Sequence, residues 1–526
     1  MSVAGETRQL SREIQVAHGL NGVVASGHTL ATEAATQVLR SGGNAVDAAV
    51  AGALVLAVVC PYACTLAGDV YFLIHDPKTR AVTGLNGTGR SPQAATLEQF
   101  SVGIPRDGAL SVTVPGFLAG LHDTLQRFGT RPFASLMAPA RALATEGFAV
   151  SSYFARNVRD RAALLARDPA AADLFLPNGV PLQEGTTFRQ PDLANMLAII
   201  EAEGPESFYR GEVANRMLAA GERIGWLIGR DDLAQHKSLE QKPISAPFHG
   251  HDVWTMPPNS YGATLLLQLL ALEAGGIANV DPDSVDFILR GFEARRAAYK
   301  VAGQLIGDPA LLEAPLRALL ERARTGFVQA DAAMPMPPES RDRCTTNVVV
   351  VDRDGLAVSL IQSISAPCGA GVVLPATGIL LNNRLAGFVN NPGSANCIAP
   401  GKRPAHTLAP CLITKSGKLT MTIGTPGTVG QTCVLAQFLA RTLACGQDLK
   451  VAADRPRWSV DFQGQPVIED TLDEDELVKL RGRLPNIRTM PSGWISFGSI
   501  KLVKAEDDGC VGLADHRRSA TTAALN

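Results

Sequence analysis

Polar and apolar residues alternate with the period of a helix near the start of the chain. The segment 29–43 (TLATEAATQVLRSGG) predicts an amphipathic helix that ends at Gly42 and Gly43, because glycine commonly follows the last helical turn. The Ala-rich segment 44–59 predicts a second helix. Its apolar run, 50–60, is about half as long as a bilayer crossing requires, so we expect a buried helix packed against a sheet.

The middle of the chain continues with helical spacing after one short hairpin. The hairpin is predicted because two apolar runs, 71–74 and 81–85, flank the turn-rich segment 75–80. Helices are then predicted over 133–146, 191–203, 211–220, 264–273 and 284–301. We expect this region to form a helical layer with loops.

The pattern changes abruptly after residue 330. Segment 331–340 is rich in proline and weakly apolar, which predicts an exposed, mobile linker. The run TTNVVVVD (345–352) follows, and Asp354-Gly355 joins it to the apolar run 356–361, which is a strong hairpin signal. The nearly continuous valines indicate a strand buried on both faces, so a flexible linker leads directly into a central strand.

The remaining segments complete a layered fold. Strands are predicted over 371–374, 411–414 and 419–423, with a turn at 415–418 and a helix over 429–443. Strands flanked by helices on the outside predict an α/β sandwich of layers.

Composition and charge exclude several classes of protein. Hydrophobic residues make up 46% of the 526 residues and charged residues 19%, which suits a globular enzyme and not a disordered chain. The formal net charge of -2 gives no sign of a nucleic-acid partner. Segment 1–15 lacks the apolar run of a secretory signal, so we expect a cytoplasmic protein without a membrane partner.

The nine cysteines do not form the pattern of a disulfide framework, because their number is odd and they are scattered. We expect reduced thiols. Cys60 and Cys64 are spaced by four residues, with His75 as the nearest histidine, and could be metal ligands. Buried small apolar side chains explain the pair better, so no metal and no cofactor are expected.

Thr345 can act as a nucleophile only if a base lies within reach of its hydroxyl. A break in the chain before Thr345 would free its α-amino group, whose pKa of about 8 suits that task. No histidine occurs near this strand, and the next one downstream is His406. From the residues alone the usual explanation is β-propensity, since threonine is common at the start of strands.

Motifs along the chain resemble those of the γ-glutamyltranspeptidase family, in order and spacing, from about residue 22 to 457. They lie at 42–49, 114–116, 138–140, 146–148, 208–211, 256–258, 345–352, 378–383, 401–404, 409–410, 424–427 and 454–457. The resemblance implies the αββα sandwich of N-terminal-nucleophile hydrolases and a precursor that cuts itself between Cys344 and Thr345. Fragments 1–344 and 345–526 would then share one αββα domain.

The resemblance also implies roles for other residues. Thr345 would be the nucleophile and, through its freed amine, the base. Ser363 matches the second hydroxyl of the family, which hydrogen-bonds the nucleophile. Gly427 and Thr428 occupy the turn whose backbone N–H groups stabilise the oxyanion, a task that does not depend on the side chain. Cys344 remains an alternative nucleophile, because cysteine also heads enzymes of this type.

The chain departs from the family where a γ-glutamyl group would be held. Segment 86–88, ending in Thr88, replaces an Asp-x-Arg segment, although Arg90 follows two residues later. Gly387 stands where the family has an acid for the α-amino group. His406 and Thr407 replace a Ser-Ser pair, and segment 61–68 replaces a glycine-rich turn. A substrate ammonium would therefore lack a partner in this site.

Arg384 adds a cation near the expected site, and its forked guanidinium suits a carboxylate. The alternative is an exposed arginine on a loop. With Arg384, Thr88, His406 and Thr407 as substrate-binding candidates, we expect a small anionic amide without an amino group.

Within the family the chain is similar to the oxamate amidohydrolase branch, which converts oxamate and water to oxalate and ammonia in purine breakdown. A cephalosporin-acylase-like enzyme, a γ-glutamyl hydrolase or transferase, and a non-catalytic binder of a small anion are the alternatives. The two fragments are expected to stay associated after cleavage. Assembly beyond that pair, a dimer among the options, stays open.

Overall fold

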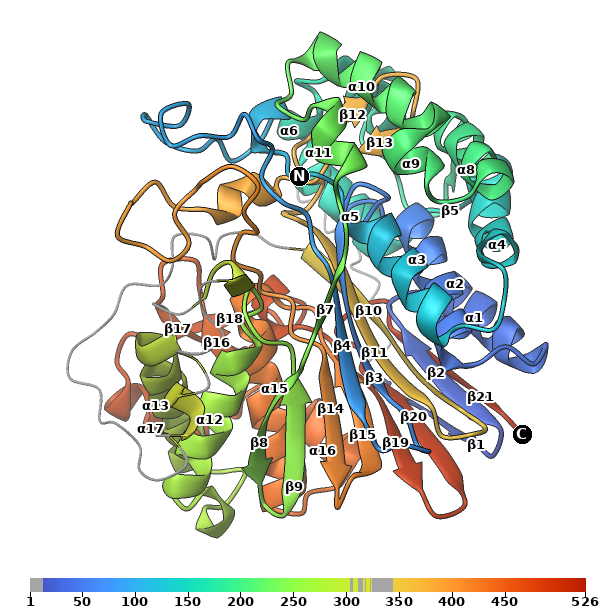
Figure 1. Cartoon of the computed structure of the whole chain (residues 1–526). Helices are drawn as coiled ribbons and strands as arrows, with labels where there is room; N and C mark the ends of the chain where they lie inside the picture. Colours follow the sequence, from blue (N-terminus) through green and yellow to red (C-terminus); the bar gives the residue numbers. More distant parts are fainter. Residues whose placement is uncertain (1–12, 303–305, 311–315, 317, 322, 324–343) are drawn as a thin grey trace, which may run out of the picture.

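Two β-sheets lie face to face, and helices cover the outer face of each sheet (Figure 1). The computed structural model describes residues 13–302, 306–310, 316, 318–321, 323 and 344–526. The four layers follow the order αββα, so the expected sandwich is confirmed. The proline-rich linker predicted at 331–340 lies outside the described residues.

Within the described residues the first sheet has seven strands, all antiparallel to their neighbours. In spatial order they are β21 (Thr521–Leu525), β2 (Gly22–Ser26), β10 (Cys344–Asp352), β11 (Ala357–Ser365), β3 (Asp69–His75), β4 (Val82–Gly87) and β7 (Leu239–Gln241). The hairpins β10–β11 and β3–β4 are those predicted from the sequence. β10 thus lies inside the sheet, paired on both sides.

The second sheet also has seven strands in the part of the chain that the structure describes. They are β1 (Gln15–Gly19), β20 (Gly509–Ala514), β19 (Lys501–Glu506), β15 (Lys418–Gly424), β14 (Cys411–Lys415), β9 (His251–Thr255) and β8 (Ile244–Phe248). Smaller sheets join β16 (Trp458–Val460), β17 (Pro466–Glu469) and β18 (Arg488–Met490), β12 (Val373–Leu374) with β13 (Ile379–Leu380), and β5 (Phe148–Ala149) with β6 (Thr187–Phe188).

Two groups of helices form the outer layers (Figure 1). The first sheet is covered by α1 (Thr29–Arg40), α2 (Ala45–Val59), α3 (Phe117–Phe128) and α4 (Phe133–Glu146). This layer continues in α5 (Ser152–Asp160), α6 (Ala162–Leu165), α7 (Pro169–Phe175), α8 (Pro191–Glu203), α9 (Ser207–Arg210), α10 (Glu212–Ile224) and α11 (Arg230–Ala234). The second sheet is covered by α12 (Gly262–Ala274), α13 (Val285–Ala302), α15 (Gln431–Leu439), α16 (Leu449–Asp454) and α17 (Glu474–Arg483).

The helix predicted over 429–443 is interrupted. A 3₁₀ turn, Thr428–Gly430, precedes α15, and a wider π-helical turn, Ala440–Ala444, follows it. The sequence pattern could not show these changes, because the apolar spacing barely differs between an α-helix and its tighter or wider turns.

The valines of β10 alternate between two hydrophobic cores, as the continuous apolar run predicted. Val348 and Val350 pack among the residues of the first helical layer, whereas Val349 and Val351 lie in the core between the two sheets. On the helical side β10 meets α2, all of whose residues are buried. A helix that is apolar on every side suits this enclosed position.

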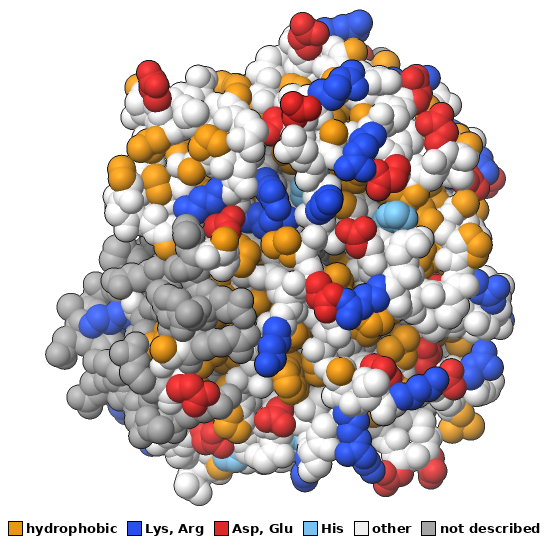
Figure 2. Space-filling view, viewed as in Figure 1, with side chains coloured by type: hydrophobic (Ala, Val, Ile, Leu, Met, Phe, Trp, Pro, Cys, Tyr) orange, Lys and Arg blue, Asp and Glu red, His pale blue; other side chains and the backbone are white. Residues whose placement is uncertain are grey.

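The surface shows no extended field of one charge on the face drawn in Figure 2. Basic and acidic side chains are interspersed there, in keeping with the net charge of -2. Within the described ranges no helix has both the length and the apolar character needed to cross a membrane.

Asp352 ties the β10–β11 turn to the start of α2. Its Oδ2 accepts a hydrogen bond from the Ala45 N–H at 2.8 Å, and its Oδ1 accepts from the N–H groups of Asp354 (3.0 Å) and Leu356 (3.1 Å). A carboxylate also suits the N-terminal end of a helix, where the backbone N–H groups give a partial positive charge.

We predict that Asp352→Ala lowers the free energy of unfolding by about 2 kcal/mol, because three backbone N–H groups lose their acceptor. Urea unfolding followed by circular dichroism measures the change. Asp354→Ala is the matched control, since the side chain of Asp354 is exposed in the same turn. Equal midpoints for the two variants would contradict this role of Asp352.

Candidate active site

Thr345 is the second residue of β10, and its side chain is buried between the strands and the neighbouring loops. The pairing of β10 with β11 is irregular at this point, because Cys344 pairs with Ser365 whereas Thr346 pairs with Gln362. Such irregularities re-aim a side chain and are common next to active sites. Thr345 therefore lies where the ladder of hydrogen bonds is interrupted.

Ser363 contacts the peptide group that precedes Thr345. Its hydroxyl donates a hydrogen bond of 2.6 Å to the carbonyl oxygen of Cys344 and accepts one of 2.8 Å from the N–H of Ser365. In the uncut chain the Ser363 hydroxyl therefore bonds the Cys344 carbonyl oxygen, and its expected hydrogen bond to the freed Thr345 hydroxyl stays a prediction. Ser363 lies opposite the irregular part of β10, between the pairs Cys344–Ser365 and Thr346–Gln362.

Arg384 is not an exposed loop residue, because its side chain is completely buried. Its Nε donates to Oδ2 of Asp69 at 3.1 Å, and its Nη2 donates to Oγ of Ser363 at 3.0 Å. Nε2 of His406 lies 3.1 Å from the same Asp69 oxygen. The alternative of an exposed arginine is therefore wrong, and the carboxylate of Asp69 already balances the charge of Arg384. A contact of Arg384 with a substrate carboxylate stays a prediction.

Asp69, the first residue of β3, was missed by the sequence analysis. Burial alone would raise the pKa of its carboxyl group, but His406, then Arg384 and the Gly89 N–H lower that pKa to about 2. The Gly89 hydrogen bond to Oδ1 measures 2.7 Å. A polar residue at the head of the apolar run 69–74 was the available signal.

The turn that holds Gly427 and Thr428 lies close to Thr345. Both residues have positive φ, 141° and 56°, and neither backbone N–H has an acceptor within the described part of the chain. Gln431, three positions after Thr428, donates from Nε2 to the Thr345 hydroxyl oxygen at 3.4 Å, and its Oε1 accepts from the Ala409 N–H. Gln431 was also missed, since a glutamine at the start of a helix carries no distinctive signal.

Thr88 faces a buried network of amides and hydroxyls. It donates to Oδ1 of Asn86 at 2.7 Å and accepts from Nδ2 of Asn259 at 3.2 Å. Tyr71 and Asn86 both donate to Oδ1 of Asn259. These hydrogen bonds fix the side chain of Thr88 within the network. Thr407, next to His406, is buried, and its hydroxyl has no hydrogen-bond partner in the described ranges.

Two further arginines lie near the Asp69 end of the site. Arg403 is buried and donates from Nε to the carbonyl oxygen of Thr88 at 3.1 Å. Burial, followed by the charge of Arg90, lowers the pKa of Arg403 to about 10. Nε of Arg90 is itself buried and has no hydrogen bond to a described residue. Nη2 of Arg403 also donates to the carbonyl oxygen of Lys237 at 2.8 Å, and the carboxylates of Asp308 and Asp69 offset part of the repulsion from Arg90.

Comparison with known proteins decides the family. The family model named gamma-glutamyltranspeptidase matches residues 31–525. This chain belongs to the γ-glutamyltranspeptidase family. It is therefore a self-processing amidohydrolase proenzyme.

Relatives within the γ-glutamyltranspeptidase family cover nearly the whole chain. The glutathione hydrolase proenzyme of Bacillus subtilis (strain 168) is 30% identical over 548 residues, which cover 97% of this chain and 93% of that protein. The acylase ACY 1 proenzyme of Pseudomonas sp. (strain SE83) is 33% identical over 468 residues, covering 85% and 83%. The solved structure of a cephalosporin acylase from Bacillus halodurans has a TM-score of 0.87 at 29% identity, covering 100% of this chain and 99% of that chain.

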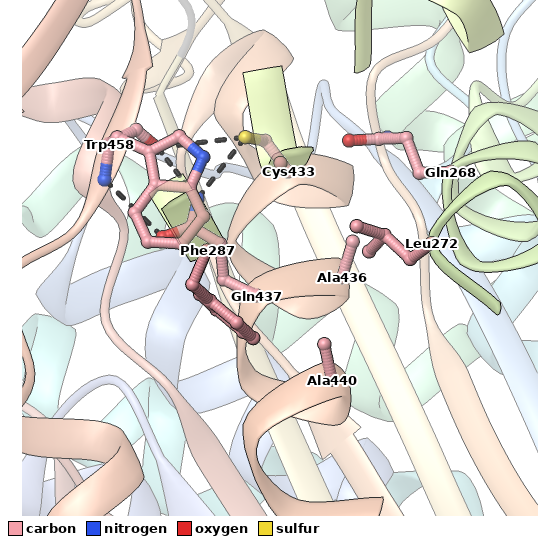
Figure 3. Close-up of a pocket in the computed structure, with 9 residues that line it drawn as sticks. Gln268, Leu272, Phe287, Cys433, Ala436, Gln437, Ala440 and Trp458 are labelled. Carbon is pink, nitrogen blue, oxygen red and sulfur yellow. Dashed lines mark hydrogen bonds between the residues drawn. The ribbon is translucent and has the colours of Figure 1, made fainter. Parts of the chain in front are cut away.

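A small cavity of about 10 Å³ lies away from this family site, in the helical layer over the second sheet. Figure 3 shows Trp458 and Phe287 on one side of it and Gln268 and Leu272 on the other. A volume of this size holds about one water molecule. The cavity is too small for an amide substrate.

The cysteines near Thr345 are buried, and their thiols have low reactivity. All nine cysteines of the chain are free thiols. Burial raises the pKa of Cys344, and burial raises that of Cys60 to about 12. Cys64 donates to the carbonyl oxygen of Leu56, and no metal-binding group of three His, Cys, Asp or Glu side chains occurs in the described ranges. A thiol with a raised pKa is a poor nucleophile.

We predict that Cys344→Ala leaves self-cleavage in place, with a small fragment that still begins at residue 345. The buried thiol of Cys344 is protonated at neutral pH, so its removal takes away no nucleophile. Mass spectrometry of the small fragment measures the outcome, and Cys368→Ala, another buried thiol, is the control. An uncut Cys344→Ala chain beside a cut Cys368→Ala chain would make Cys344 the nucleophile instead.

Proposed function

We propose that this proenzyme cuts itself between Cys344 and Thr345, and that the new N-terminal threonine hydrolyses a small amide. The observation that carries the proposal is the hydrogen bond from Ser363 to the Cys344 carbonyl oxygen, 2.6 Å long and completely buried. A donor on that oxygen makes the adjacent carbonyl carbon more electrophilic. The hydroxyl of the next residue, Thr345, is held by Gln431 in the same buried site.

After cleavage the α-amino group of Thr345 supplies the missing base. Its pKa of about 8 lets it accept the hydroxyl proton near neutral pH. The N–H groups of Gly427 and Thr428, which lack acceptors among the described residues, would stabilise the oxyanion of the bound amide. A histidine base is not needed, and His406 is paired with Asp69.

The two fragments, 1–344 and 345–526, would stay associated because strands of both fragments pair with one another in each sheet. In the first sheet β2 and β3, from the large fragment, flank the β10–β11 hairpin of the small one. In the second sheet β9 pairs with β14 across the same division. Separation would break several ladders of backbone hydrogen bonds, which are costly to leave unpaired.

The substrate that suits the site is a small amide with a carboxylate and no amino group, such as oxamate. Arg90 and Arg403 provide cationic groups beside the site, and the buried Thr407 hydroxyl offers a further polar contact. Gly387 has no side chain with which to hold an ammonium group. Arg384 is balanced by Asp69, so the carboxylate-binding role passes to Arg90 and Arg403.

An acylase activity on longer amides is the second candidate. It is favoured by the similarity to a cephalosporin acylase over the full length of both chains. A γ-glutamyl substrate fits less well, because its ammonium would lose water without gaining a partner. A non-catalytic binder of small anions would keep the chain intact.

We predict that Thr345→Ala abolishes both self-cleavage and amide hydrolysis, because the variant has no hydroxyl to attack the Cys344 carbonyl. Electrophoresis and mass spectrometry should show one chain of 526 residues. Thr345→Ser keeps a hydroxyl and should still be cut. Thr346→Ala, which alters the neighbouring buried threonine, is the matched control. A cut Thr345→Ala chain would exclude Thr345 as the processing nucleophile.

We predict that the processed protein releases ammonia from oxamate and does not cleave glutaryl or γ-glutamyl amides. Arg90→Ala should raise KM for oxamate by roughly ten-fold or more, because a charge-assisted contact to the carboxylate is lost. Arg353→Ala, an exposed arginine, is the control. Turnover of glutaryl amides alone would favour the acylase, and turnover of γ-glutamyl amides would favour a glutathione hydrolase.

A further inference from the structure

A continuous chain of hydrogen bonds connects a buried ion pair to the peptide bond that is proposed to be cut. It runs from Asp69 through Arg384 and Ser363 to the carbonyl oxygen of Cys344. All four residues are at most 1% exposed. Electrostatic effects are strong in such a place, because little water is present to screen them.

The direction of each hydrogen bond in this chain is fixed by chemistry. A carbonyl oxygen can only accept, so the single hydroxyl proton of Ser363 must point at Cys344. The lone pairs of Ser363 Oγ then accept from Nη2 of Arg384 and from the N–H of Ser365. A cation that donates to a hydroxyl makes that hydroxyl a stronger donor. The charge of Arg384 is therefore transmitted to the scissile carbonyl.

Asp69 sets the position of Arg384. Asp69 and Ser363 are direct partners in the pairing of β3 with β11, so their side chains start from neighbouring points on the sheet. Arg384 enters from the loop that follows β13 and bridges the two, with Nε on Asp69 and Nη2 on Ser363. The planar guanidinium holds these two directions rigidly, which a lysine could not do.

We infer that Asp69 and Arg384 are positioning residues for self-cleavage, which act by polarising Ser363 and through it the carbonyl group of Cys344. The inference rests on the proposed cut at Cys344–Thr345. In that reaction the Thr345 hydroxyl oxygen bonds to the Cys344 carbonyl carbon, and negative charge develops on the oxygen that Ser363 holds. Arg384 stabilises this charge through the hydroxyl, without touching the reacting atoms.

The remaining steps balance without a cofactor. The C–N bond of the peptide breaks, the nitrogen takes the proton lost by the hydroxyl, and an ester joins Cys344 to the side chain of Thr345. Water then adds to the ester carbonyl carbon, and the C–O bond to the Thr345 side chain breaks. One proton of the water goes to the hydroxyl oxygen, and the other is taken up by the new amine. The products are a carboxylate on Cys344 and a free hydroxyl and amine on Thr345.

Pulse-chase cell-free translation of the full chain tests the inference, because it follows the uncut chain from its synthesis. Ser363→Ala should slow cleavage by roughly a hundred-fold or more, and Ser363→Thr, which keeps the hydroxyl, should restore it. Arg384→Gln should slow cleavage by roughly ten- to hundred-fold. Arg441→Gln, which alters another buried arginine paired with an acid, Asp283, should leave the rate unchanged.

A charge-balanced double variant separates polarisation from simple structural support. Arg384→Gln alone leaves the carboxylate of Asp69 buried without its cation, which can destabilise the fold. Asp69→Asn/Arg384→Gln removes both charges, so thermal unfolding should return towards that of the wild type while cleavage stays slow. Wild-type cleavage by the double variant, or by Arg384→Gln, would overturn the inference.

Failure of the proposed function would give an experimental result different from failure of this inference alone. In that case the wild-type chain itself would stay intact, or mass spectrometry would place its cut at another bond. The inference alone fails if the wild type is cut before Thr345 and the Arg384 variants are cut equally fast.

Discussion

The structure depends on one constraint, which is that β10 is buried on both faces and is hydrogen-bonded on both sides over residues 348–352. β2 and β11 pair with it, and its valines alternate between two cores. The paired part of the strand, residues 348–352, anchors its start, where β11 alone pairs with Cys344 and the Ser363 hydroxyl holds the Cys344 carbonyl oxygen. Groups delivered by other segments can then be placed around that peptide to within hydrogen-bonding distance.

The buried ion pair of Asp69 and Arg384 carries a free-energy cost, because both charged groups lose their hydration. Here the cost is partly offset by the further contacts of the carboxylate with the Gly89 N–H and with His406. The ion pair also changes the chemical role of Arg384. Paired with Asp69, the guanidinium of Arg384 polarises the Ser363 hydroxyl. Without Asp69 its unbalanced charge would attract an anion, and that anion would compete with the Cys344 carbonyl oxygen for the Ser363 hydroxyl.

Much of the fold could be predicted from local patterns, but the hydrogen bonds and ion pairs of the site could not. The valine run of β10 and the apolar run of α2 carry their own periodicity, and Thr345, Ser363 and Arg384 were found through motifs. The contact of Arg384 with Asp69 joins residues 315 positions apart, and that of Gln431 with Thr345 joins residues 86 apart. No local period encodes such contacts, because they arise only when separate strands and loops meet.

Two separate sets of donors are available to the proposed site, one on the Cys344 carbonyl oxygen and one in the turn that precedes Gln431. Ser363, backed by Arg384, is already engaged with the Cys344 carbonyl oxygen in the uncut chain. The N–H groups of Gly427 and Thr428 have no acceptor in the described ranges. If the first set serves cleavage and the second serves the substrate, one hydroxyl performs two acyl transfers with oxyanions on different sides. Groups on the substrate side would then change without altering the donors that hold the Cys344 carbonyl oxygen.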